Sequence, residues 1–167
     1  MTGGMQYKVW PWATAIAIVA IGYGARSAIG TVYGEAEARQ LLEALSRAGL
    51  YLGSAIATAA ATTLALMLTL IGMIRRSDTD FDDDTYRRVV LISTLATVTL
   101  LTSLVVLLAF VFPVGEFEAL PDGWYSTLYD VLFGACVLMV ALLATTVIVT
   151  YLTLRHVIAR ITPTDDI

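Results

Sequence analysis

Two long apolar stretches joined by one short charged segment constrain this chain more than any other feature. The stretches cover about residues 49–74 and 89–114, and the segment between them, residues 75–88, begins and ends with a pair of arginines. A helix needs about 20 apolar residues to cross the roughly 30 Å hydrocarbon core of a bilayer. The pattern therefore predicts two transmembrane helices connected by a hairpin that stays in water.

Two further stretches of the same kind cover about residues 9–30 and 124–154. The first could be a signal peptide, but Tyr23 and Arg26 fit poorly near a small-residue cleavage site, so we interpret it as a retained helix. Across the chain 58% of the residues are apolar and 14% are charged, which is typical of a membrane protein and not of a soluble domain. We therefore predict an all-α, integral membrane four-helix bundle, with residues 1–167 forming a single four-span domain.

The segment before the second span, residues 31–48, is amphipathic. Glu35 and Arg39, and again Glu43 and Arg47, have the i,i+4 spacing that favours a solvated helix face, and leucines lie between them. This segment either lies on the membrane surface or simply extends the second span into water. We favour the extension and expect one long helix.

Orientation follows from the positions of lysine and arginine, because loops rich in these residues stay in the cytoplasm. Seven of them fall on one side of the predicted membrane, and three fall on the other, namely Arg26, Arg39 and Arg47. The seven are Lys8, Arg75, Arg76, Arg87, Arg88, Arg155 and Arg160. Both termini and the 75–88 hairpin are predicted to be cytoplasmic, and residues 31–48 and 115–123 extracytoplasmic, in a plasma or inner membrane.

Composition also excludes several classes of function. The net charge is −4 and Lys8 is the single lysine, so nucleic acid is not expected as a partner. With one cysteine, Cys136, and one histidine, His156, the chain offers no recognisable zinc, haem or iron–sulfur ligand set, and we expect no cofactor and no metal. No catalytic constellation can be assembled within the spans, so we do not expect an enzyme.

The hairpin carries acidic residues at spacings that resemble a calcium loop. The match fails, because Asp83 stands where the turn glycine is needed and Val89 where a bidentate glutamate is needed. We interpret these carboxylates as solvated groups that cap the third helix. The alternative is a docking surface for a cytoplasmic partner, made by Asp80, Asp82, Asp83, Asp84, Arg87 and Arg88.

Threonines recur within the spans at intervals that place their hydroxyls on one helix face. Such a face could line a polar path, although a membrane threonine more often bonds to its own preceding turn or to a neighbouring helix. The candidates for polar lining are Thr58 and Thr62 in the second span and Thr146, Thr150 and Thr153 in the fourth.

Asp130 lies a few residues inside the fourth span, and Arg26 lies near the end of the first. The predicted topology brings both to the outer interface, where they are candidates for an ion pair. A carboxylate inside a membrane often marks function, and a ring of Asp130 side chains in an oligomer would favour cations. The structural alternative is an acid stabilised by the helix dipole and by Arg26.

Small residues at Gly53, Ala57 and Ala61 recur every fourth position, which lets another helix approach closely, within the chain or between copies. Our leading prediction is a non-enzymatic membrane protein that self-associates into a homo-oligomer and forms a channel for ions or small solutes. The alternative is a scaffold or sensor subunit that docks a cytoplasmic partner through the 75–88 hairpin.

Overall fold

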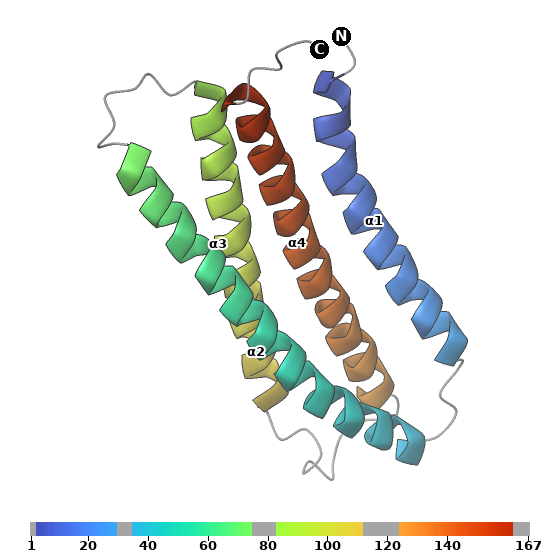
Figure 1. The fold of residues 1–167 in the computed structure, drawn as a ribbon. Coiled ribbons are helices and arrows are strands. Elements are labelled where there is room, and N and C mark those ends of the chain that lie inside the picture. Colours follow the sequence, from blue (N-terminus) through green and yellow to red (C-terminus); the bar gives the residue numbers. More distant parts are fainter. Residues whose placement is uncertain (1–2, 30–34, 75–82, 112–123, 162–167) are drawn as a thin grey trace.

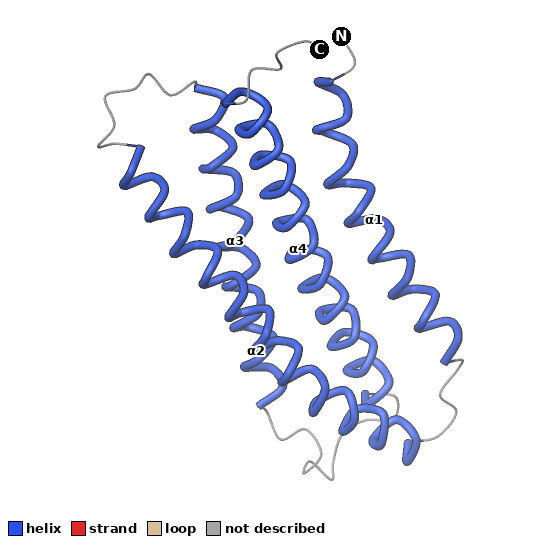
Figure 2. The backbone as a smooth tube through the Cα atoms, viewed as in Figure 1, coloured by secondary structure: helices blue, strands red, loops and turns tan. Residues whose placement is uncertain are grey.

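The computed structural model shows four helices in the part of the chain that it describes (Figure 1). They are α1 (Gly3–Ile29), α2 (Glu35–Ile74), α3 (Asp83–Val111) and α4 (Trp124–Ile161). Side chains are described for residues 9–28, 40–72, 86–111 and 124–155. Every described element is helical, which confirms the all-helical prediction for these residues (Figure 2).

α2 is one helix of 40 residues, so most of the amphipathic segment, residues 35–48, continues into the second apolar stretch without a break, as predicted. Other helices extend beyond the predicted spans. α3 begins at Asp83, inside the predicted hairpin, and α4 continues to Ile161, past the predicted end at residue 154. The outer segment 115–123 lies outside the described residues.

Three of the helices contain segments long and apolar enough to cross a membrane: Gln40–Gly72, Tyr86–Val111 and Trp124–Arg155. The chain is therefore compatible with a multi-pass membrane protein. Over its described residues, 9–28, α1 is not among the three. Its tryptophans, its proline at position 11, its glycines and Arg26 lower its mean hydropathy.

α4 is the central helix, because it packs against each of the other three. α1 lies at the edge of the bundle and packs chiefly against α4, and α2 crosses α3 and the lower end of α4 (Figure 1). The start of α1, the end of α2, the start of α3 and the end of α4 all lie at one end of the bundle. We call this the terminal end and the other the distal end.

Buried residues on α3 recur at alternating intervals of three and four, which is the spacing of helices packed as in a coiled coil. They are Val89, Ile92, Ala96, Thr99, Ser103, Val106 and Phe110. The first half of α4 repeats the spacing with Tyr125, Tyr129, Leu132, Cys136 and Met139. These two seams form most of the bundle core.

Glycines set the distance between α2 and α3. Gly49 faces the ring of Phe110 so closely that a Cβ would overlap it, and a Cβ on Gly53 would lie 2.9 Å from Cδ2 of Leu107. The third small residue of the predicted series, Ala61, is exposed on the outside of the bundle. The series therefore divides between packing within the chain and an outward face.

Candidate functional site

A bidentate ion pair joins α1 to α4 near the distal end. Arg26 donates from Nε to Oδ1 of Asp130 at 2.6 Å and from Nη2 to Oδ2 at 3.2 Å. Arg26 lies in the last turn of α1, where the helix dipole favours a positive charge, and Asp130 lies in the second turn of α4. The structure thus brings together the two residues that the sequence suggested as partners.

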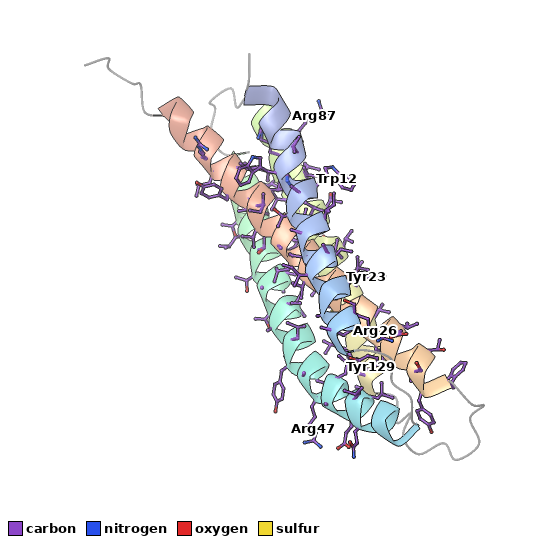
Figure 3. The ribbon with its side chains drawn as sticks, turned by 90° about the vertical axis from the view of Figure 1, so that its right-hand side faces the viewer. Trp12, Tyr23, Arg26, Arg47, Arg87 and Tyr129 are labelled. Atoms are coloured by element: carbon purple, nitrogen blue, oxygen red, sulfur yellow. The ribbon has the colours of Figure 1, made fainter. Side chains whose placement is uncertain are left out.

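Aromatic rings support the arginine. The guanidinium carbon of Arg26 lies 5.8 Å from the ring centroid of Tyr129, within the range of a cation–π contact. Tyr129 is buried and its ring stacks on Phe133 at a centroid distance of 6.0 Å. Figure 3 shows Arg26 beside Tyr129 at the end of the bundle opposite Arg87 and Trp12. The tyrosine therefore helps to fix the direction in which Arg26 reaches α4.

This geometry changes what Asp130 offers to a ligand. Its side chain is 47% exposed, but both of its oxygens accept hydrogen bonds from Arg26. An arginine pair of this kind neutralises the carboxylate and holds it in place. Asp130 is built into the contact between α1 and α4, and it does not present a free negative charge to a passing cation.

The predicted threonine lining does not form one polar surface. Thr146 and Thr153 are buried in the core, and Thr150 is half-buried beside them. Thr58 and Thr62 are exposed on the outside of α2. Each of these hydroxyls donates to a carbonyl one turn earlier in its own helix, at 2.8–2.9 Å. The five side chains present mainly their methyl groups to their surroundings.

Two further buried hydroxyls lie in α3, where the sequence reading assigned no role. Thr99 and Ser103 are completely buried, and they donate to the carbonyls of Leu95 and Thr99, both at 2.8 Å. Their positions fall on the alternating three- and four-residue spacing of the α3 seam. That spacing is the signal by which they could have been found.

The outer face of α2 carries a continuous stripe of small residues, which we call the α2 stripe. It consists of Ser54, Thr58, Ala61, Thr62, Ala65 and Thr69, all exposed. Leu66 and Leu68 are also exposed on α2, beside the stripe. The exposed residues of α3 include Thr94 and Thr97 and the larger side chains of Val98, Leu101, Leu104, Val105 and Leu108. The α2 stripe is thus a place where the backbone of another helix can approach closely.

An apolar groove opens at the terminal end between α1, α3 and α4, with a volume of about 760 Å³. Arg87 and Arg88 of α3 lie at its terminal end, and Trp12 of α1 forms part of one wall. Its other lining residues are Pro11, Ala15, Leu91, Leu95, Leu142, Thr145, Val149, Leu152 and Thr153. Sequence reasoning assigned Arg87 and Arg88 to partner docking and missed the groove.

The remaining docking candidates are only partly placed. Asp80 and Asp82 lie outside the described residues, and Asp83 and Asp84 form the first turn of α3 without described side chains. Among the residues whose side chains are described, no three His, Cys, Asp or Glu gather closely enough to hold a metal ion. A scan of protein-family models and searches of curated proteins and of solved structures gave no match to this chain.

Proposed function

We propose that this chain is a non-enzymatic, four-span membrane protein that acts by association, with copies of itself in the bilayer and with a soluble partner in the cytoplasm. The observation that carries the proposal is the α2 stripe. A lipid-facing helix gains nothing from replacing leucine by alanine and threonine, but a helix–helix contact does, because small residues let two backbones approach.

The contacts of α1 along α4 support the proposal that α1 crosses the membrane. Arg26 meets Asp130 near the distal end, and Gly22 lies so close to Val137 that a Cβ would be 2.6 Å from its Cγ2. At the terminal end, α1 and α4 line the same groove. A helix that packs along a membrane-spanning neighbour over this length crosses the same part of the bilayer. Four spans then place both termini on one side.

The positions of lysine and arginine favour the cytoplasm for the terminal end, in a plasma or inner membrane. Arg87, Arg88 and Arg155 are described there, whereas Arg26 and Arg47 lie toward the distal end. The acidic residues of the 75–88 hairpin then face the cytoplasm, where they are our candidate contact for a soluble partner. This partner contact is the scaffold function predicted as the alternative.

A passage for ions or small solutes has less support as the role of one chain. Asp130 is neutralised by Arg26, and the threonine hydroxyls are bonded to their own helices. A water-filled path needs polar groups that turn toward a common lumen. Such a passage would have to form between copies, with the α2 stripe at the contact.

Disulfide cross-linking tests the self-association. Cys136 is the single cysteine and is buried, so Cys136→Ser gives a background into which one new cysteine is placed. We expect Thr62→Cys to form disulfide-linked dimers when membranes are oxidised, because copies meet along the α2 stripe.

Val98→Cys is the matched control. Val98 is exposed on α3, and the antiparallel register set by Gly53 and Leu107 places it at about the depth of Thr62. We expect far less dimer from Val98→Cys than from Thr62→Cys. Equal yields at the two positions, together with a monomeric mass in detergent, would contradict the proposal.

A further inference from the structure

We infer that the groove between α1, α3 and α4 binds one anionic phospholipid, with its phosphate at Arg87 and Arg88 and one acyl chain along the apolar walls. This site lies at the terminal end and does not involve the α2 stripe. It rests on the placement of the helices in a membrane, and not on self-association.

The walls of the groove are suited to an acyl chain. Leu91, Leu95, Leu142 and Val149 supply most of the apolar surface below the arginines. The two threonines in the lining do not interrupt it. Thr145 donates its hydroxyl to the carbonyl of Ala141 at 2.7 Å, and Thr153 donates to that of Val149 at 2.8 Å. With the hydroxyls bonded in this way, both residues contribute methyl groups to the walls.

The length of the groove corresponds to one leaflet. Its lining on α4 extends from Leu142 to Thr153, which at about 1.5 Å per residue is about 16 Å along the helix. The hydrocarbon core of a bilayer is about 30 Å thick, so this is about half of it. A lipid from the leaflet at the terminal end can therefore lay a chain in the groove while its headgroup stays at the surface.

The charge at the groove's terminal end is complementary to a phosphate. Arg87 is exposed and Arg88 is half-buried, and both lie in the second turn of α3, which begins at Asp83. Arg88 already takes part in another interaction, but a guanidinium carries five N–H donors and can engage a second acceptor. Arginine pairs well with phosphate because it offers two parallel donors.

Trp12 marks the level of the interface. The residue is 70% exposed and lines the groove at the same end as the arginines. Tryptophan is enriched at the headgroup level of membranes. The order of groups, with arginines and tryptophan at the interface and aliphatic residues below them, matches the order of headgroup and chain in a phospholipid.

A helix from another protein fits this groove less well. It would bring apolar or polar side chains, and no phosphate, to the two arginines. The charge at the groove therefore favours a lipid.

Quenching of Trp12 fluorescence by brominated lipid tests the inference. Trp10→Phe with Trp124→Phe leaves Trp12 as the single tryptophan in the full chain. The protein is placed in phosphatidylcholine vesicles that contain a few per cent of phosphatidylglycerol with brominated chains. We expect quenching to saturate at this low fraction, whereas brominated phosphatidylcholine at the same fraction quenches only in proportion to its amount.

Two substitutions separate the headgroup contact from the chain contact. Arg87→Gln with Arg88→Gln should weaken the preference for phosphatidylglycerol about 25-fold, or about fivefold for each arginine. Arg155→Gln, a basic residue at the same end outside the groove lining, should leave it unchanged. Ala15→Leu fills the groove and should also abolish saturation, unlike Ala13→Leu on the exposed face of the same helix.

Three results would overturn the inference. Equal quenching by the two brominated lipids would show that no anionic headgroup is selected. An equal loss with Arg155→Gln would show general attraction to a basic surface. Protection of Trp12 from both lipids would show that protein covers the groove. Each readout is independent of the Thr62→Cys cross-link, so the two proposals can fail separately.

Discussion

At the scale of single residues, the Arg26 and Asp130 pair is the polar contact with the clearest consequence. The pair lies between α1 and α4, and its two hydrogen bonds use both carboxylate oxygens. Removing one partner leaves a charge near the membrane without its counterion, which is unfavourable in a poorly solvated setting. Removing both leaves two neutral side chains and no unpaired charge.

A double-mutant cycle should therefore show strong coupling between the two residues. We expect Arg26→Gln and Asp130→Asn each to lower the midpoint of thermal unfolding in detergent, and the double variant to lower it less than the two losses added together. Glu43→Gln is the control, because Glu43 pairs with Arg47 on an exposed helix face and such pairs contribute little. If the unfolding midpoint falls no further in these variants than in Glu43→Gln, the ion pair does not stabilise the contact of α1 with α4.

The sequence could suggest this pair but not its role. The predicted topology put Arg26 and Asp130 at the same interface, which made a pair plausible. It could not show that both carboxylate oxygens are used, or that Tyr129 lies under the guanidinium. For the threonines, helical spacing gave the shared face of each helix, but the direction of that face depends on how the helices are rotated against their neighbours.

At the scale of helices, the contact between α2 and α3 depends on close approach at two glycines. The ring of Phe110 occupies the space that a side chain at Gly49 would need, and an aromatic ring cannot bend aside as the end of a leucine can. Overfilling a packed core forces the backbone or the side chains out of their preferred geometry.

Gly49→Leu should therefore destabilise the bundle by about 1–3 kcal/mol. Gly134→Leu is the control, because a Cβ at Gly134 meets nothing within 4 Å and the residue is exposed on α4. Chemical denaturation in mixed micelles measures the free energy of unfolding of both variants. Similar losses for the two variants would mean that Gly49 is not a point of close contact.

Element boundaries and seams were only partly readable from the sequence. The apolar stretches predicted helices. The alternating three- and four-residue spacing of the α3 seam is also visible in the sequence and could have indicated which face of α3 is buried. The predicted start of the third helix was too late, because Asp83 to Arg88 are helical although they are polar, whereas residues 35–48 continue α2 as predicted. The groove at the terminal end could not be predicted from the sequence, because it is made by residues of three helices that are far apart in sequence.

At the scale of the whole molecule, the place of α1 decides the topology. Within the described residues three helices are long and apolar enough to span a membrane, and three crossings alone would leave the two termini of the chain on opposite sides. α1 follows α4 from the Arg26 pair to the terminal groove, which supports a fourth crossing. Four crossings return the chain to the side on which it began.

Labelling of single cysteines with a membrane-impermeant maleimide shows directly on which side of the membrane each position lies. In the Cys136→Ser background, Gly4→Cys and Thr164→Cys should react from the cytoplasmic side, in inverted vesicles. Thr31→Cys and Glu118→Cys should react from the outside, in intact cells. If Gly4→Cys and Thr31→Cys react from the same side, α1 does not cross the membrane and the four-span account is wrong.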